Sequence, residues 1–246
     1  MGISETVSDW SGRAVDFDPR SWSQTAYYAT WHGDGIYKST NGGYHWEKSN
    51  SGMGSAKIYP NGIAYEPGNP NCIYLASFGN DVHGVLKSTD LGDSWSMAGL
   101  SQKYIYSVGT PAYSRDIIFA GTLSDGFYKS INGGSTWSHN NVGLINSNVS
   151  GLAFQNETSL YGSTKGGGVF RSQNGGLTWS EFNNNLSDRN INGLVLNPAN
   201  PNLLYALTNT SGLQKIDLSS SSGWSQATIP FLQPLEEEEA EFQDRK

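Results

Sequence analysis

The feature that most constrains this chain of 246 residues is a short segment that recurs four times. Each copy reads Ser-x-Asx-x-Gly-x-x-Trp, and we call such a segment an Asx box. The boxes span residues 39–46, 88–95, 130–137 and 172–179, and a fifth, irregular copy spans residues 217–224. Self-similarity of this kind is the signature of a fold that repeats one supersecondary unit.

Strand signals accompany every box at a constant place. The expected first strands are residues 12–17, 62–65, 107–110, 151–154 and 193–196. The expected second strands are residues 26–30, 72–77, 117–122, 159–164 and 203–208. The expected third strands, which alternate apolar and polar side chains, are residues 35–39, 84–88, 126–130, 168–172 and 212–216. Each unit therefore reads strand A, strand B, strand C, box, strand D, and the units step by roughly 42 to 50 residues, which is the spacing of propeller blades.

The box has a physical interpretation as a tight turn between strands C and D. Its Asn or Asp is expected to bond the backbone two residues on, and its glycines supply positive φ. The closing tryptophan is expected to begin strand D and to pack between neighbouring blades. We therefore assign a structural role to Ser39, Asn41, Gly43, Trp46, Ser88, Asp90, Gly92, Trp95, Ser130, Asn132, Gly134, Trp137, Ser172, Asn174, Gly176, Trp179 and Trp224.

The sequence predicts an all-β fold, a β-propeller of five four-stranded antiparallel blades that close into one ring. The 30 glycines and the low charged fraction of 15% suit many hairpins between short strands. We expect an N-terminal leader at residues 1–10, the propeller at 11–228 and an acidic, disordered tail at 229–246. Pro230, Pro234 and the glutamates after them oppose a sixth blade. A docking segment for a basic partner is the alternative for the tail.

The units resemble the Asp-box, or BNR, repeats of sialidases, xyloglucan-cleaving hydrolases, sortilin-type receptors and photosystem II assembly-factor-like proteins. The resemblance covers residues 11–228, which is most of the chain. It implies a propeller fold. It leaves the function open, because those relatives include hydrolases, receptors and assembly scaffolds.

Charge and composition exclude several classes of function. The net charge is -7, and residues 236–246 contribute -4 of it, so the chain has no basic surface for nucleic acid. Cys72 is the only cysteine, and the four histidines are scattered, so we expect no metal site and no cofactor. No apolar run is long enough to span a membrane. The compartment stays open; an extracytoplasmic one would require a signal peptide that has been removed.

Catalysis is a weaker interpretation than binding. The resemblance to sialidases would imply an arginine cluster, and the six arginines are dispersed. Xyloglucan-cleaving relatives use two large propellers, and the position of their acidic residue holds His32 here. If the chain is a glycoside hydrolase, its carboxylates are Asp34, Asp81 and Asp125 on the B–C loops. The alternative is that these three aspartates are Asx-turn residues that precede glycines.

Aromatic and polar side chains gather on the loops between strands B and C and between successive blades. Flat apolar contacts fixed by a few hydrogen bonds suit a peptide or a sugar ring, although such aromatics also pack between blades. We predict a non-catalytic binding or assembly module with a protein partner, the alternative being a carbohydrate-active propeller, either a lectin or a glycoside hydrolase. The candidate binding residues are Trp31, His32, Asp34, Tyr59, Phe78, Asp81, His83, Tyr104, Tyr106, Lys165 and Arg189.

Overall fold

The protein consists of five antiparallel sheets, each with four strands in sequence order, and each sheet is one blade. The computed structural model describes residues 12–20, 22–30, 33–54, 58–79 and 82–227, and within these ranges every regular element is a strand. The predicted leader at 1–10 and tail at 229–246 lie outside the described residues. No described helix is long and apolar enough to cross a membrane.

The twenty strands match the predicted pattern of four per unit. The innermost strands are β1 (Gly12–Phe17), β5 (Pro60–Glu66), β9 (Ile105–Gly109), β13 (Val149–Phe154) and β17 (Ile191–Asn197). The second strands are β2 (Ala26–Thr30), β6 (Asn69–Phe78), β10 (Ile118–Thr122), β14 (Leu160–Thr164) and β18 (Asn200–Thr208). The third strands are β3 (Ile36–Ser39), β7 (His83–Ser88), β11 (Phe127–Ser130), β15 (Gly168–Ser172) and β19 (Leu213–Asp217). The outer strands are β4 (Glu47–Lys48), β8 (Ser96–Met97), β12 (Ser138–His139), β16 (Ser180–Glu181) and β20 (Ser225–Gln226).

The outer strands differ from the prediction in one respect. Each has only two residues and begins one residue after the tryptophan of the box. The tryptophan therefore ends the turn rather than beginning strand D. Its backbone N–H is engaged elsewhere: those of Trp95, Trp179 and Trp224 donate to carbonyls of the preceding blade.

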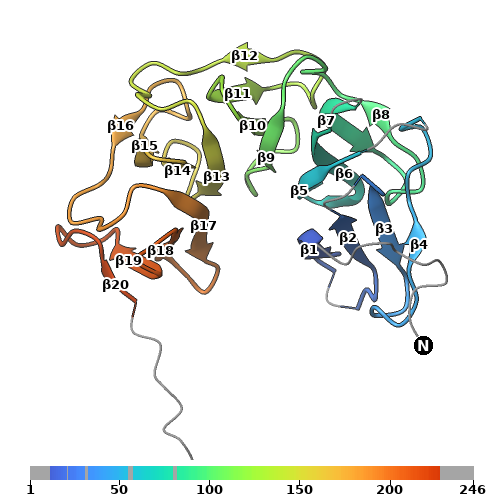
Figure 1. Ribbon diagram of the computed structural model, residues 1–246, viewed down its shortest axis with the longest axis horizontal. Coiled ribbons are helices and arrows are strands. Elements are labelled where there is room, and N and C mark those ends of the chain that lie inside the picture. The colour runs from blue at the N-terminus through green and yellow to red at the C-terminus, as the bar shows by residue number, and fades with distance from the viewer. Residues whose placement is uncertain (1–11, 21, 31–32, 55–57, 80–81, 228–246) are drawn as a thin grey trace, which may run out of the picture.

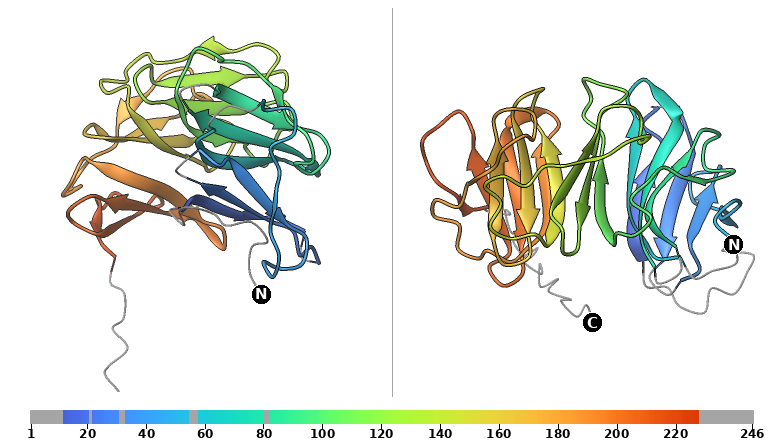
Figure 2. Two further views of the ribbon diagram at one scale, coloured as in Figure 1. Left: turned by 45° about the vertical axis from the view of Figure 1, so that its right-hand side comes forward. Right: turned by 90° about the horizontal axis from the view of Figure 1, so that it is seen from above.

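The five blades form an open arc, so the expectation of a closed ring was wrong for the described residues. Consecutive inner strands contact each other from β1 to β17. Figure 1 shows the first and last blades at opposite ends of the arc, and Figure 2 shows the same arrangement from two other sides. The rotation from one blade to the next is set by packing between them, and four such steps do not turn the chain through a full circle.

The hydrophobic core lies between blades. Four clusters of buried side chains each join two neighbouring sheets. At the junction of the third and fourth blades, for example, Phe119 and Phe127 pack with Leu160, Phe170 and Trp179. Burial of large apolar side chains is the main stabilising contribution here, so each blade depends on its neighbours for a complete core.

Inside the box, the serine and the Asx residue divide the hydrogen bonding between them. In the second box, Ser88 Oγ accepts from the N–H groups of Asp90 at 3.3 Å and Gly92 at 2.7 Å. Asp90 Oδ1 accepts from the N–H of Ser94 at 2.9 Å. The bond to the residue two positions on is thus made by serine, and the Asx side chain reaches four positions on. Positive φ occurs at Leu91 (59°) and Gly92 (78°), which the turn requires.

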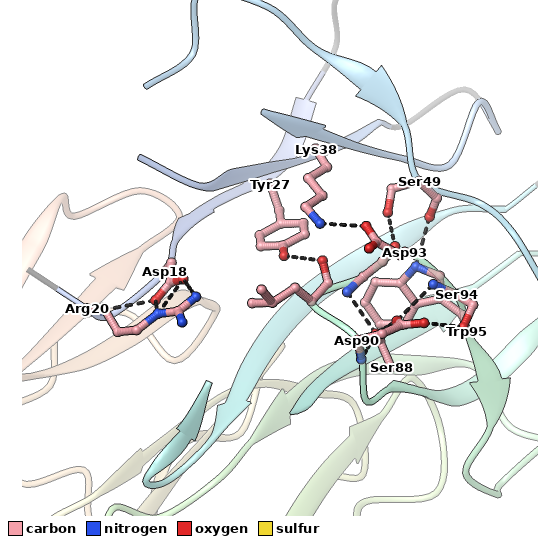
Figure 3. Close-up of polar contacts among 12 residues, drawn as sticks. Asp18, Arg20, Tyr27, Lys38, Ser49, Ser88, Asp90, Asp93, Ser94 and Trp95 are labelled. Atoms are coloured by element: carbon pink, nitrogen blue, oxygen red, sulfur yellow. Dashed lines mark hydrogen bonds and ion pairs between the residues drawn. The ribbon is translucent and has the colours of Figure 1, made fainter. Parts of the chain in front are cut away.

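The indole N–H of the box tryptophan ties each blade to the one before it. It donates to the carbonyl that lies three residues after the preceding box's tryptophan. These bonds run from Trp95 to Ser49 (2.8 Å), from Trp137 to Ala98 (2.9 Å), from Trp179 to Asn140 (2.9 Å) and from Trp224 to Phe182 (2.7 Å). Figure 3 shows the first of these junctions, where Ser49 Oγ also donates to the carbonyl of Gly92. Trp46, in the first blade, donates instead to Gly43 of its own turn at 2.9 Å.

The second box should make the free energy of unfolding depend on pH in the acidic range. Hydrogen bonds from the hydroxyl and the backbone N–H of Ser94 lower the pKa of Asp90 to about 2. Because the pKa of this carboxyl is lower in the folded state than in the unfolded state, it stabilises the fold at pH values above the unfolded-state pKa. That stabilisation is lost as the pH falls toward 2. We expect Asp90→Asn to remove this loss between about pH 4 and pH 2, an effect below about 1 kcal/mol because the carboxylate is exposed.

Melting temperatures of the two proteins measured from pH 5 to pH 2 check this expectation. An asparagine at position 90 should preserve the turn. The third box already has Asn132 at this position, and its Nδ2 donates to Thr136 Oγ1 at 2.8 Å. In the second box the equivalent bond runs the other way, from Ser94 Oγ to the carboxylate of Asp90. Parallel losses of melting temperature in the two proteins would show that Asp90 carries none of the acid dependence.

Candidate functional site

Two sets of loops meet along one rim of the arc, which we call the loop face. The B–C loops comprise residues 33–35, 79, 82, 123–126, 165–167 and 209–212 among those described, and the D–A loops comprise 49–54, 58–59, 98–104, 140–148 and 182–190. Ile58 of a D–A loop forms bridges with Asp34 and Val82 of the B–C loops on either side. The N–H of Leu123 donates to the carbonyl of Tyr104 at 3.0 Å. The predicted grouping of these loops is therefore present.

Hydroxyl groups at the ends of the second strands close the B–C loops. Threonine Oγ1 donates to a glycine carbonyl in four blades. The bonds run from Thr30 to Gly35 (3.0 Å), from Thr122 to Gly126 (3.0 Å), from Thr164 to Gly168 (3.2 Å) and from Thr208 to Gly212 (2.8 Å). The Asx-turn interpretation of Asp125 is wrong, because the N–H of Phe127, two residues on, donates to Asn141 Oδ1 and not to the carboxylate.

An asparagine four residues after the box tryptophan connects the D–A loop to the B–C loop of the same blade by hydrogen bonds. Asn141 Oδ1 accepts from the N–H of Phe127 at 2.7 Å, and its Nδ2 donates to the carbonyl of Asp125 at 2.6 Å. Asn50 and Asn183 make the same pair of bonds in the first and fourth blades. The sequence analysis did not predict a role for these asparagines, although their constant spacing from the box tryptophan could have indicated one.

Replacing Asn141 by alanine is expected to lower the free energy of unfolding by about 2 kcal/mol, because it leaves the N–H of buried Phe127 without its partner. The matched control is Asn140→Ala, which keeps the carbonyl that accepts from Trp179 and should cost less than about 0.5 kcal/mol. Urea unfolding of the three proteins measures both. Equal midpoints for the two variants would contradict a bracing role for Asn141.

Four aromatic side chains from the second and third blades form one cluster on the loop face. The Phe78 ring lies 5.6 Å from Tyr104 and 6.3 Å from Tyr106, and His83 lies 5.2 Å from Tyr104, between ring centroids. Phe78 pairs with His83 across β6 and β7, and Tyr104 directly precedes β9. Tyr104 is 42% exposed, so the cluster presents a ring to solvent. His83 Nδ1 lies 3.1 Å from the carbonyl of Gly79.

The other predicted residues are distributed along the rim. The carbonyl of Tyr59 accepts from the N–H of Phe78 at 3.1 Å, which places Tyr59 beside the cluster. Lys165 bonds Asn192 Oδ1, and Arg189 pairs with Glu181 at 3.2 Å, both at the fourth and fifth blades. Asp34 lies on the first blade. Trp31, His32 and Asp81 lie outside the described residues.

Asp125, one of the three candidate carboxylates, is held in an ion pair. Lys103 Nζ donates to Asp125 Oδ2 at 2.7 Å, and this bond raises the pKa of the lysine above its ordinary value. Lys103 was missed from the sequence, since nothing in its local pattern indicates a partner 22 residues away. Because both groups are partly exposed, the pair contributes little stability, but it occupies the carboxylate.

Three further features of the described residues bear on other kinds of site: metal-binding groups, the cysteine and a surface groove. They contain no group of three or more His, Cys, Asp or Glu side chains that could hold a metal ion. Cys72 is buried, and burial raises the pKa of its thiol. A polar groove of about 220 Å³ lies between the first two boxes, lined by residues that include Lys38, His45 and Asp93. Most of its lining residues belong to the first box, β3 and β4, and only Ser49 belongs to the loop face.

Comparison with solved structures identifies the architecture. No family model and no curated protein matches the sequence. An ancestral GH74 enzyme superposes with a TM-score of 0.70 and 23% identity, over 88% of this chain and 31% of that one. The GH74 xyloglucanase from Xanthomonas campestris gives 0.66 and 16%, over 87% and 38%. YCF48 bound to D1 peptide gives 0.64 and 15%, over 88% and 68%.

At these identities the likeness shows the fold alone. The chain is an all-β protein of five propeller blades, as predicted. It spans about a third of the length of the two GH74 enzymes.

Proposed function

We propose that this chain is a non-catalytic propeller module that binds a protein partner through its loop face. The observation that carries this proposal is the cluster of Phe78, His83, Tyr104 and Tyr106, which joins two blades and exposes a ring. Aromatic side chains lose little conformational freedom on binding and offer large apolar area, so such clusters are typical anchors at interfaces.

The partner that fits this surface is an extended peptide segment with at least one apolar side chain. The rings provide flat contact, while the phenol groups and the imidazole can fix the segment by hydrogen bonds. The cluster is built on the ends of strands, so little ordering is needed when the segment docks. The similarity to YCF48, whose structure is of a complex with D1 peptide, supports a peptide ligand by analogy of fold.

Selection from a random peptide display library tests the proposal. Immobilised protein should enrich peptides that share an apolar or aromatic position, and Tyr104→Ala should abolish the enrichment. The matched control is Tyr44→Ala, because Tyr44 is 78% exposed but lies in the first box, outside the loop face. Absence of any enriched sequence, or enrichment that survives Tyr104→Ala, would contradict the proposal.

The second candidate function is a carbohydrate-active propeller, favoured by the similarity to GH74 enzymes. Glycoside hydrolysis in most families needs two carboxylates that flank the scissile bond. Asp34 is on the first blade, and the carboxylate of Asp125 is paired with Lys103. Hydrolysis of xyloglucan or another polysaccharide that is lost in Asp34→Asn would favour this function over the first.

A further inference from the structure

The junctions between blades share one directional contact. The B and C strands of one blade present a tyrosine or phenylalanine and a lysine, or Arg171 in the fourth blade, toward the next blade; we call this side the forward face. Lys38 Nζ bonds Asp93 Oδ1 at 2.6 Å in the second box. In the third and fourth boxes, a lysine bonds the carbonyl of the fourth box residue. These bonds run from Lys87 to Gly133 (3.4 Å) and from Lys129 to Gly175 (2.7 Å).

The fifth blade carries a complete forward face, and none of the described strands packs on it. Tyr205 pairs with Lys215 across β18 and β19, as Tyr74 pairs with Lys87 in the second blade. None of the described residues forms a hydrogen bond or an ion pair with Lys215 Nζ. Strand register places Val195 and Leu207 on this face, at the positions of Ala64 and Ala76 in the second blade.

The exposure of these equivalent positions differs sharply. Val195 is 58% exposed and Leu207 is 49% exposed. In the second blade, Ala64 is 8% exposed and Ala76 is fully buried under the third blade. The fifth blade thus has larger apolar side chains where the second has alanine, and they face solvent. Exposed apolar side chains of this kind mark a contact surface.

The first blade carries the complementary side, which we call the backward face. Val15 is 57% exposed and Phe17 is 63% exposed, on the side of β1 opposite to the second blade. The equivalent residues of the second blade are Ile63 and Tyr65, which pack into the first junction. Trp46 belongs to the same end. Among the described residues its indole N–H donates to its own Gly43 alone, whereas Trp137 donates both to its own Gly134 and to Ala98 of the preceding blade.

We propose that two copies of this chain associate head to tail, with the backward face of one docked on the forward face of the other. By the register of the internal junctions, Trp46 Nε1 of one copy donates to the carbonyl of Ala227 of the other. Ala227 lies three residues after Trp224, the spacing of every acceptor in the arc. Lys215 Nζ of the second copy donates to the carbonyl of Gly42 of the first, the fourth residue of the first box.

A second copy is the occupant that the structure favours. Its first blade offers the same box and the same kind of apolar face that four internal junctions already accept. The contact is heterologous, since two different surfaces meet, and each copy therefore has one donor end and one acceptor end.

Sedimentation velocity over a range of protein concentrations tests the proposal. The wild-type chain should associate as concentration rises. Phe17→Glu, on the backward face, and Leu207→Glu, on the forward face, should each be monomeric where the wild type associates. A 1:1 mixture of these two variants should form a heterodimer, because the mixture still contains one intact backward face and one intact forward face. The control is Ile131→Glu, in which a residue 68% exposed in the third box is changed away from both ends.

A wild-type chain that stays monomeric at all concentrations would overturn the proposal, as would association that only one of the two variants abolishes, since that indicates like faces in contact. Circular dichroism confirms that each variant folds. Trp46→Phe keeps an aromatic ring but removes the N–H together with part of the indole, and it should weaken the association about threefold to tenfold. An unchanged dissociation constant for Trp46→Phe would contradict the predicted register.

Discussion

Replacing Trp179 by alanine is expected to lower the free energy of unfolding by about 3 to 5 kcal/mol. Trp179 is 4% exposed, and its ring stacks on Phe127 with centroids 4.3 Å apart. Its indole N–H also donates to the carbonyl of Asn140 in the preceding blade. The substitution removes a buried ring and strands that carbonyl at the junction between the third and fourth blades.

Trp46 provides the matched control, because it has the same place in its box but bonds no other blade among the described residues. It is only half-buried and bonds its own turn, so Trp46→Ala should cost less than half as much. Urea unfolding, monitored by circular dichroism at a dilution where the chain is monomeric, gives both values. Similar costs for the two substitutions would show that the box tryptophan acts within its own turn and not between blades.

The contact between Phe127 and Gly162 should give the second large effect. A Cβ built on Gly162 would lie 2.1 Å from the tip of the Phe127 ring, so the fourth blade accepts phenylalanine only because glycine faces it. Gly162→Ala should cost about 1 to 3 kcal/mol through overpacking. Phe127→Val should cost about 2 to 4 kcal/mol through the cavity it leaves.

The two substitutions should partly compensate each other when they are combined. The double variant recreates the pairing of the preceding junction, where Val85 and Ala120 occupy the equivalent positions in one cluster. We expect the combined loss to be smaller than the sum of the single losses by about 1 to 3 kcal/mol. Unfolding of the four proteins in urea measures this coupling, and strict additivity would contradict the inferred size match.

The blades could be predicted from the sequence because the features that define each blade lie close together in the chain. Apolar alternation, box glycines and spacing all lie within one unit, so β2 (Ala26–Thr30) was predicted to the residue. Closure of the ring was predicted wrongly. It depends on the rotation at each junction, which arises from contacts such as that of the Phe127 ring with Gly162, 35 residues away in the sequence.

The candidate site was predictable in its location but not in its contacts. Loop positions follow from the strand order, so Phe78, His83 and Tyr104 were placed on one face. The ion pair of Lys103 with Asp125 and the bracing bonds of Asn141 connect neighbouring segments through side-chain geometry that no periodicity indicates. Hydrogen-bond partners of this kind depend on the assembled fold.

The most direct test of the account is the affinity of a selected peptide for the loop face, measured by isothermal titration calorimetry. The account predicts that Tyr104→Ala and His83→Ala weaken binding at least about tenfold, a loss of roughly 1.4 kcal/mol or more, while Tyr44→Ala leaves it unchanged. Equal dissociation constants for all four proteins would contradict the claim that this aromatic cluster is the binding site.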